Sequence, residues 1–333
     1  MTNQSSIPTI SAIIPARDSE KTLALCLQGI KASTTPVQEI IVVSDGSTDA
    51  TCEIAQQHGV RVIELSSNHQ ANSCRNAGAA QATGEILLFL DSDVVLQPEA
   101  VQNALDSLRE GRFDAVLGLY SARHRHPNIA SQYKNLWIRY SYLKSRRSVD
   151  WIFGAIAMIR KEAFTKAGGF DRSLFMHKGG DLELGKRMAH ARPSIILNPT
   201  VEAEHLKQHT LLSLLRNDLE RSQGFVQLAA NLGQLSRSLT KGFVNVYPGF
   251  VYSAALSWVI VLCLLLGIWF DALRWIGLAC AGAYLLLNLP FLVYYARHRE
   301  VAEIPAVLGL MFLDHLACAL GSIKGMFRWL FSR

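Results

Sequence analysis

The sequence predicts an α/β domain with a mostly parallel central sheet, followed by a helical region in a membrane. Three observations support this fold class. The apolar run Ile86–Leu90 ends abruptly in two carboxylates, Asp91 and Asp93. Strand-like runs alternate with helical patterns through the first ninety residues. Half of the 333 residues are hydrophobic, which is unusual for a purely soluble protein, and the apolar excess is concentrated beyond Lys241.

Four strands are expected in this first part, with helices between them. The strands are expected at residues 9–14, 39–43, 60–65 and 85–90, and the helices at 18–32, 49–58 and 70–82. Strands that alternate with helices are typical of a parallel sheet built from βαβ units. The pattern leaves the strand order open, but the polar loops after the first, second and fourth strands should gather at one edge of the sheet.

Asp91 and Asp93 come directly after the fourth strand, where open α/β sheets bind ligands. Two acids two residues apart form a hard oxygen site that suits Mg²⁺ or Mn²⁺ carrying a diphosphate. The pair alone fits an ordinary turn equally well, because Asp and Ser often end strands. No Gly-x-Gly-x-x-Gly motif follows the first strand, which argues against an NAD-type Rossmann domain.

The alternating pattern continues past Asp93. The expected elements are helices near 98–109 and 162–167, strands at 114–120 and 151–160, and a turn at 168–171. The basic segment 123–127 is expected to be a solvated face rather than a site.

Asp181 follows two glycines at what looks like the start of a helix. The helix dipole favours a negative charge in the first turn, so simple capping would also account for it. Glu183 and Arg187 lie four residues apart and fit a structural ion pair. His205 ends a strand-like segment and is a weaker candidate for a site.

Composition narrows the class of partner and the compartment. The formal net charge is +6, but no aromatic–basic recognition module is evident, so we expect no nucleic-acid partner. Attraction to anionic membrane lipids accounts for the charge more simply. The six cysteines form no Cys-x-x-Cys pair and are expected to be free, mostly buried and in a reducing compartment. No secretory signal peptide is recognised at the start.

The apolar tail is expected to follow an amphipathic helix and to cross a membrane. Residues 210–230 mix leucines with charges, which suits a membrane surface or packing against the polar domain. No charge occurs at 242–270 or 275–296, and about 20 apolar residues suffice for a span. A third run is interrupted by Asp314 and His315. The expected organisation is a domain at 1–209, an interfacial helix and linker at 210–241, and a transmembrane region at 242–333, with spans at 248–270, 275–296 and 304–323.

Positive charges indicate the orientation of these spans. Arg297 and Arg299 follow the second run, whereas Arg274 stands alone between the first and second runs. This distribution places the polar domain on the cytoplasmic side of an inner or plasma membrane. Lys324 and Arg328 would then lie outside if the third run spans, so a re-entrant or interfacial third segment stays open.

Six short motifs give the chain a likeness to a known family. They are, in order, Ile13–Asp18, Val42–Asp49, Cys74–Gly78, Asp91–Asp93, Gly168–Asp171 and Gly180–Leu184. With these motifs in this order and spacing, residues 8–210 resemble the inverting family 2 glycosyltransferases with a GT-A fold, of the membrane-anchored bacterial type.

The resemblance implies a nucleotide-diphosphate sugar donor. Pro15, Asp18 and Asp45 match positions near the nucleoside, and Asp45 would accept a hydrogen bond from a base N–H. Arg75 matches a position beside the nucleotide, and Asp91 a position by the ribose and the metal.

The resemblance also implies a metal and a catalytic base. Asp93 would bind Mg²⁺ or Mn²⁺ directly with Asp91 beside it, and His205 is a third candidate ligand. The metal offsets charge on the leaving diphosphate. Asp181 matches the base that takes the proton from the acceptor hydroxyl. The family usually has Glu-Asp here, whereas this chain has Gly180-Asp181, which leaves the handling of the acceptor open.

These residues together predict a metal-dependent, hexosyltransferase-like enzyme for a cell-envelope glycan. It would move one sugar onto a lipid-linked or membrane-borne hydroxyl, because the Gln-x-x-Arg-Trp motif of processive synthases does not follow Asp181. Two alternatives remain at this point. One is a polyprenyl-phosphate glycosyltransferase, whose phosphate nucleophile needs no base. The other is a non-catalytic nucleotide-sugar-binding membrane protein.

Overall fold

The computed structural model describes residues 8–66, 69–109, 113–171, 180–190, 194–236, 240 and 246–331. These residues form two compact units. The first unit contains the described residues of 8–123, 146–171 and 180–207, and the second contains those of 124–145 and 208–331. The second unit therefore combines the C-terminal region with a segment from the middle of the chain.

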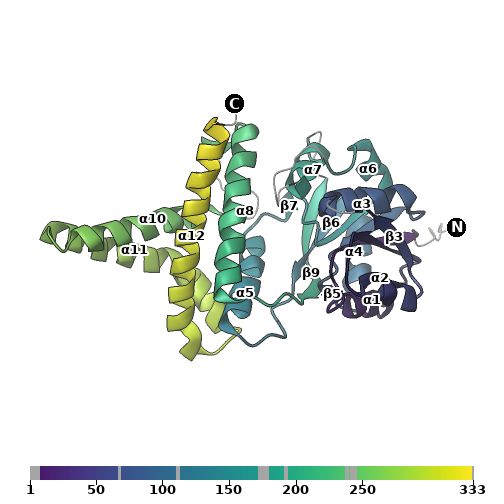
Figure 1. Cartoon of the computed structure of the whole chain (residues 1–333), viewed down its shortest axis with the longest axis horizontal. Coiled ribbons are helices and arrows are strands. Elements are labelled where there is room, and N and C mark those ends of the chain that lie inside the picture. Colours follow the sequence, from purple (N-terminus) through teal and green to yellow (C-terminus); the bar gives the residue numbers. More distant parts are fainter. Residues whose placement is uncertain are drawn as a thin grey trace. The chain divides into compact units, whose positions relative to one another are not determined.

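The first unit is a mixed sheet with helices packed on it (Figure 1). Its strands are β1 Ile10–Ala16, β2 Glu39–Asp45, β3 Arg61–Leu65, β4 Ile86–Leu90, β5 Val94–Leu96, β6 Ala115–Tyr120, β7 Ser148–Val149, β8 Ile156–Arg160 and β9 Ile195–His205. Its helices are α1 Leu23–Lys31, α2 Thr51–Gln57, α3 Gln70–Gln81, α4 Ala100–Arg109, α6 Lys161–Lys166 and α7 Gly180–Met188.

The strand order is β3-β2-β1-β4-β8-β6-β9-β5, with β7 paired to β9. The strands β1 to β4 are parallel to their neighbours within this group. Strand β8 runs antiparallel to both β4 and β6 and makes the sheet mixed. The carboxyl ends of β1, β2 and β4 therefore meet at one edge, as the sequence predicts, and the α/β fold class is confirmed.

Helix α3 lies close against the sheet because of Gly78. A Cβ atom built on Gly78 would lie 2.5 Å from Cγ2 of Ile13 and 3.2 Å from Cγ2 of Val43. A larger residue would push α3 away from β1 and β2. The close packing fixes the height of α3, and this height positions Arg75 one turn earlier in the helix.

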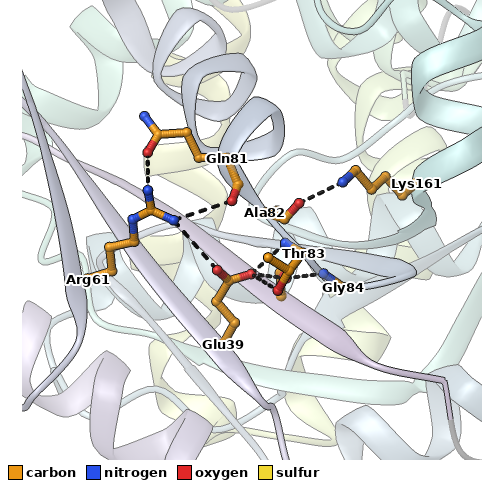
Figure 2. A network of polar contacts seen from close by, with 8 residues as sticks. Glu39, Arg61, Gln81, Ala82, Thr83, Gly84 and Lys161 are labelled. Carbon is orange, nitrogen blue, oxygen red and sulfur yellow. Dashed lines mark hydrogen bonds and ion pairs between the residues drawn. The ribbon is translucent and has the colours of Figure 1, made fainter.

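The opposite edge of the sheet is closed by polar contacts around Glu39 (Figure 2). The Glu39 carboxylate accepts hydrogen bonds from Ser11 Oγ at 2.5 Å and from the Thr83 backbone N–H at 2.8 Å. Arg61 lies 3.8 Å from its second oxygen, and Lys161 donates to the Ala82 carbonyl at 2.6 Å. These contacts connect the start of β2 to the loop before β4, so this edge is structural.

The second unit is helical in the part that the structure describes. Its elements are α5 Ile129–Leu143, α8 Leu211–Asn231, α10 Pro248–Leu266, α11 Asp271–Ala296, the 3-10 turn η1 Val301–Glu303 and α12 Ile304–Phe331. Three of them, at Pro248–Leu266, Asp271–Ala296 and Val301–Phe331, are long and apolar enough to cross a membrane by length and composition. They overlap the three expected spans.

Most expected elements are confirmed within a few residues, but two expectations are corrected. The strand expected at 151–160 begins only at Ile156, after a loop. The basic segment 123–127 is not uniformly solvated, because the His124 side chain is buried while Arg123 and Arg125 are exposed. The six cysteines are free, and Cys26, Cys74 and Cys318 are buried.

Candidate active site

The predicted donor-binding residues lie at the carboxyl edge of the parallel strands. Pro15 is a buried residue of β1 in register with Val43 of β2. Asp18 follows in the next loop with a positive φ of 46°, a conformation that Asp tolerates better than most residues. Its Oδ1 accepts a hydrogen bond from the Thr48 backbone N–H at 2.9 Å. Asp18 therefore holds the loops after β1 and β2 together.

Asp45 closes the start of α3. The side chain is only 7% exposed, and its two oxygens accept from the backbone N–H groups of His69 at 2.8 Å and Gln70 at 3.1 Å. The first N–H groups of a helix have no partner within the helix, so this carboxylate satisfies two of them. Asp45 thus has a positioning role, and contact with a nucleoside base remains a prediction.

Arg75 projects from α3 toward the end of β4. Its Nη2 lies 2.5 Å from Asp91 Oδ1, and its Nη1 donates to Asn72 Oδ1 at 2.8 Å. The Arg75 side chain is 7% exposed and that of Asp91 is 34% exposed. The buried Nε of Arg75 has no hydrogen-bond partner among the described residues. The pair therefore has one unsatisfied donor on a guanidinium close to a partly open carboxylate.

Asp93 lies against His205. Strand β5 pairs with β9 so that Val94 faces His205, and the Leu206 N–H donates to the Asp93 carbonyl at 2.8 Å. This register brings His205 Nε2 to 3.5 Å from Asp93 Oδ2. The imidazole stacks on the Tyr120 ring, with centroids 4.3 Å apart and planes 3° from parallel. Tyr120 therefore sets the plane in which His205 presents its nitrogen.

Opposing effects act on the pKa of Asp93. Burial raises the pKa of this carboxyl, but the hydrogen bond and charge of His205, together with the charge of Lys207, outweigh burial and leave the pKa below its ordinary value. Asp93 is therefore a carboxylate at neutral pH, which is the form that binds a cation.

Asp181 lies in the first turn of α7 and reaches the loop before β8. Its Oδ2 accepts from the Gly154 N–H at 3.2 Å, and its Oδ1 accepts from the Leu182 N–H at 3.1 Å. Gly154 also lies against Arg75, because a Cβ built on it would be 2.9 Å from the Arg75 Cζ. The backbone of one glycine thus separates the predicted base from the Arg75–Asp91 pair.

Helix α7 is held in place by a glycine and by an ion pair. A Cβ on Gly185 would collide with the backbone of Trp151, so α7 packs directly on the loop that carries Gly154. Glu183 Oε1 accepts from Arg187 Nε at 2.6 Å, as the sequence predicts, and Arg187 also donates to the Gly169 carbonyl at 2.6 Å. The Glu183–Arg187 pair is structural and keeps the first turn of α7 near the sheet.

A separate hollow lies between α3, α6 and α7. Its volume is about 890 Å³, and its lining includes Asn76, Phe170, Glu183 and Arg187. None of the predicted site residues lines this hollow. Asn76 is fully engaged there, since its side chain exchanges two hydrogen bonds with the Phe170 backbone at 2.7 and 2.9 Å. The predicted catalytic and donor-binding residues therefore lie outside this hollow.

The three predicted metal ligands fit a divalent cation in kind. Asp91 and Asp93 supply carboxylate oxygens, which Mg²⁺ and Mn²⁺ prefer, and His205 supplies an imidazole that Mn²⁺ accepts. Asp93 and His205 are adjacent, while Asp91 is engaged by Arg75. Within the described ranges, no three His, Cys, Asp or Glu side chains already converge closely enough to hold an ion. Asp93 and His205 are thus the nearest pair that would hold the metal.

Sequence reasoning missed two contributors to this site. Gly154 and Tyr120 belong to no motif, and each matters through its place in the fold. Gly154 acts through its backbone and its lack of a side chain. Tyr120 acts by stacking on His205, a residue more than eighty positions away in the chain. Neither contact can be predicted from the sequence before the strand order is known.

Comparison with known proteins gives one family match and several relatives. Residues 11–168 match the family model described as glycosyl transferase family 2. The chain is 28% identical over 244 residues to a validoxylamine A glucosyltransferase of Streptomyces hygroscopicus subsp. jinggangensis, covering 62% of this chain and 58% of the relative. It is 32% identical over 194 residues to the glycosyltransferase GlyG of Streptococcus pneumoniae serotype 4, covering 51% and 64%. The chain thus spans less than two thirds of these curated relatives.

A solved structure is similar over almost the whole chain. It is the mannosyltransferase PcManGT from Pyrobaculum calidifontis in complex with GDP-Man and Mn²⁺. The TM-score is 0.59 at 18% identity, and the match covers 99% of this chain and 89% of that one. At this level of identity the likeness concerns the fold.

Proposed function

We propose that this protein is a membrane-anchored, inverting enzyme that transfers one sugar, because residues 11–168 match the family 2 glycosyltransferase model and lie on a mixed sheet of the GT-A type. The donor is a nucleotide-diphosphate sugar and the acceptor is a hydroxyl on a lipid-linked or membrane-borne molecule. Three helices of span length in the same chain support this class of acceptor, since a tethered active site favours substrates that are held at the same bilayer.

One observation carries the proposal. Asp181 and the Arg75–Asp91 pair, from α7, α3 and the end of β4, come together around the backbone of Gly154. Transfer of a sugar from a nucleotide diphosphate needs a base, a cationic group and a carboxylate near each other. Here these groups lie at the carboxyl edge of the sheet. Residues that only cap a helix or end a strand would not need to lie close to one another in this way.

Asp181 is proposed to act as the general base. Its carboxylate takes the proton of the acceptor hydroxyl as that oxygen forms a bond to the anomeric carbon. The bond from the anomeric carbon to the diphosphate oxygen breaks, and its electron pair leaves with the diphosphate. A single displacement from the opposite face inverts the anomeric configuration. The N–H groups of Gly154 and Leu182 orient the carboxylate for this step.

The leaving diphosphate is proposed to lie by Arg75, Asp91 and Asp93. The unsatisfied Nε of Arg75 is a charged donor that a phosphate oxygen would satisfy. Asp93 and His205, with Asp91, would hold Mg²⁺ or Mn²⁺, which supplies positive charge opposite the diphosphate. PcManGT binds GDP-Man and Mn²⁺, and this supports the same classes of donor and cofactor here.

The proposal places the first unit on the cytoplasmic side of an inner or plasma membrane, where nucleotide sugars are made. Pro15, Asp18 and Asp45 would line the nucleoside end of the donor. Asp18 is hydrogen-bonded to the loop after β2, and Asp45 at the end of β2 is hydrogen-bonded to the start of α3, so this end of the site is formed before the donor arrives.

The test uses purified full-length protein in bilayers with Mn²⁺, radiolabelled UDP- and GDP-sugars and membrane lipid extract. We expect one labelled sugar per acceptor molecule, and we expect Asp181→Asn to lower the rate of product formation by at least about a hundredfold. Asp106→Asn, an exposed carboxylate of α4, is the matched control and should keep full activity.

The alternatives give different results in the same assay. If Asp181→Asn turns over as fast as the parent, the nucleophile needs no base and a polyprenyl-phosphate acceptor replaces the hydroxyl. If no donor is turned over although nucleotide sugars bind, the chain is a non-catalytic binding protein. Long labelled chains would contradict the single transfer.

A further inference from the structure

Helices α8 and α12 pack against each other at backbone distance. A Cβ on Gly321 would collide with the Leu219 carbonyl, and one on Gly325 would lie 2.6 Å from the Gln223 carbonyl. Both contacts advance by four residues along each helix, so the two helices run in the same direction. Figure 1 shows α8 and α12 side by side. Wherever the second half of α12 lies in a membrane, α8 must lie beside it.

Helix α8 carries charges that a hydrocarbon environment does not accept. Arg216 and Glu220 form an exposed ion pair with 81% and 44% of their side chains accessible. Asp218, two residues from each of them in the sequence, forms a buried ion pair with Lys134 of α5. A charged side chain at the centre of a bilayer is strongly unfavourable. The α8–α12 pair therefore does not fit the middle of a membrane.

Helix α12 crosses the α10–α11 hairpin rather than running along it (Figure 1). Two hydrogen bonds join α12 to the hairpin at adjacent residues of α12. Trp258 Nε1 donates to the Leu316 carbonyl at 3.2 Å, and Tyr284 Oη lies 2.7 Å from His315 Nδ1. A helix that crosses two membrane spans lies in the plane of the bilayer. The hairpin alone is long enough to span, since its 19 and 26 residues extend about 28 and 39 Å.

The face of α12 that points away from α8 is an exposed apolar stripe. It is formed by Leu313, Leu320, Ile323, Phe327 and Leu330, of which Leu320 is 46% and Phe327 57% exposed. These positions recur at intervals of seven, three and four residues, so they share one side of the helix. Lys324 and Arg328 are exposed beside the stripe, where long basic side chains reach the lipid head groups while their stems stay apolar.

We propose that α10 and α11 are the two membrane spans, and that α12 lies in the membrane interface with its apolar stripe in the acyl boundary. The α8 helix covers the side of α12 that faces away from the lipid. Asp314 and His315 then sit inside the protein, where Tyr133 Oη donates to Asp314 at 2.8 Å. The occupant of the stripe is the bilayer itself.

This topology removes a conflict in the charge distribution. With two spans, the basic residues after α11 and those of α12 lie on the same side as the first unit. Arg297, Arg299, Lys324 and Arg328 would all face the cytoplasm, as the positive-inside rule requires. With three spans, Lys324 and Arg328 would lie on the outside.

The first test compares the two ends of the full chain. One epitope is placed before Met1 and a different one after Arg333, and sealed membrane vesicles are treated with protease. We expect both epitopes to be cleaved in the same vesicle population and both to be protected in vesicles of opposite orientation. Cleavage of one epitope with protection of the other means an odd number of spans and overturns the proposal.

The second test measures depth in the bilayer. In a background with Cys52, Cys263 and Cys280 replaced by alanine, a spin label is attached at Phe327→Cys or, as the matched control, at Leu264→Cys. We expect the α12 label to collide with a water-soluble nickel complex and the α10 label to collide mainly with oxygen. An equally deep position for both labels, or shielding of Phe327→Cys by a second copy of the chain, rejects the interfacial placement. Neither result depends on the proposed catalytic activity.

Discussion

At the scale of single residues, Gly154 is central to the geometry of the candidate site, although it belongs to none of the six sequence motifs. It donates to Asp181 and leaves room for the Arg75 guanidinium. The proposed base and the proposed diphosphate site are therefore coupled through a position that has no functional group of its own. Because of this coupling, even the methyl group of an alanine at position 154 is expected to disturb the site.

Gly154→Ala is predicted to weaken donor binding and transfer. The added methyl group would lie 2.9 Å from Arg75 Cζ, so Arg75 must move away from Asp91. We expect a loss of at least about tenfold in kcat/KM, equivalent to about 1.4 kcal/mol, measured with the preferred donor. Gly282→Ala, where nothing lies within 4 Å of the new methyl, is the control. An unchanged kcat/KM in the first variant would show that Arg75 does not contact the donor.

His205→Ala is predicted to weaken the binding of Mn²⁺. His205 is adjacent to Asp93 and held by Tyr120, so its loss removes one proposed ligand and leaves the other unsupported. We expect an increase of about 10- to 100-fold in the apparent metal constant. The measurement is Mn²⁺-dependent quenching or calorimetry with the purified protein, which needs no turnover. An unaltered titration would remove His205 from the metal site.

Glu39→Gln is predicted to lower stability in a pH-dependent way. Partial burial raises the pKa of Glu39, but hydrogen bonds from Ser11 and Thr83 and the charge of Arg61 outweigh it, so the folded pKa lies below the ordinary value of 4.5. A lowered folded pKa gives stability that is present above about pH 4.5 and is lost as the pH falls through the folded value. The difference in Tm between parent and variant should therefore be largest near neutral pH and shrink in acid. A difference that grows in acid would contradict this sign.

At the scale of elements, the strands were the easiest part to predict. Strand β4 is apolar throughout, β2 contains the apolar run 40–43, and β1 is apolar apart from Ser11, because these strands are buried on both faces of the sheet along most of their length. The acidic ends of these strands were also predicted to meet, since carboxyl ends of parallel strands share an edge.

Helix α5 is missed by the sequence analysis, although Tyr133, Trp137 and Tyr140 recur at helical spacing and are buried. Polar side chains are buried beside this apolar stripe, among them Ser131, Gln132, Lys134 and Asn135. These polar groups are satisfied by residues far away in the chain, as when Ser131 Oγ accepts from the His209 N–H at 2.8 Å. The sequence does not show which segment satisfies these buried polar groups, because their partners are brought close only by the fold.

Gly321→Leu is predicted to separate α8 from α12. The new side chain would collide with the Leu219 carbonyl, which is backbone and has little freedom to move. Overpacking of this kind costs about 1–3 kcal/mol, and thermal unfolding in detergent measures it. Gly309→Leu on the same helix is the control, because nothing lies within 4 Å of the added Cβ. Equal Tm values for the two variants would mean that the close helix contact is absent in solution.

At the scale of the whole molecule, the two compact units do not correspond to two continuous stretches of the sequence. Residues 124–145 lie between two parts of the first unit in sequence, yet they belong to the second unit together with the tail. Lys134 of α5 forms an ion pair with Asp218 of α8, and this contact is one reason why α5 belongs to the second unit. The chain therefore leaves the first unit, contributes one helix to the second unit, and returns. A division drawn only from hydropathy places this helix with the polar domain.

The central claim is that Asp181 takes a proton in a sugar transfer from a nucleotide donor. The most direct measurement compares donor binding and single-turnover rate for the parent and Asp181→Asn in the same bilayer preparation. The account predicts that the dissociation constant of the donor changes by less than about threefold while the rate of transfer falls by at least about a hundredfold, within the range for loss of a general base. A variant that transfers sugar at the parental rate, or that loses donor binding and rate in equal proportion, would contradict it.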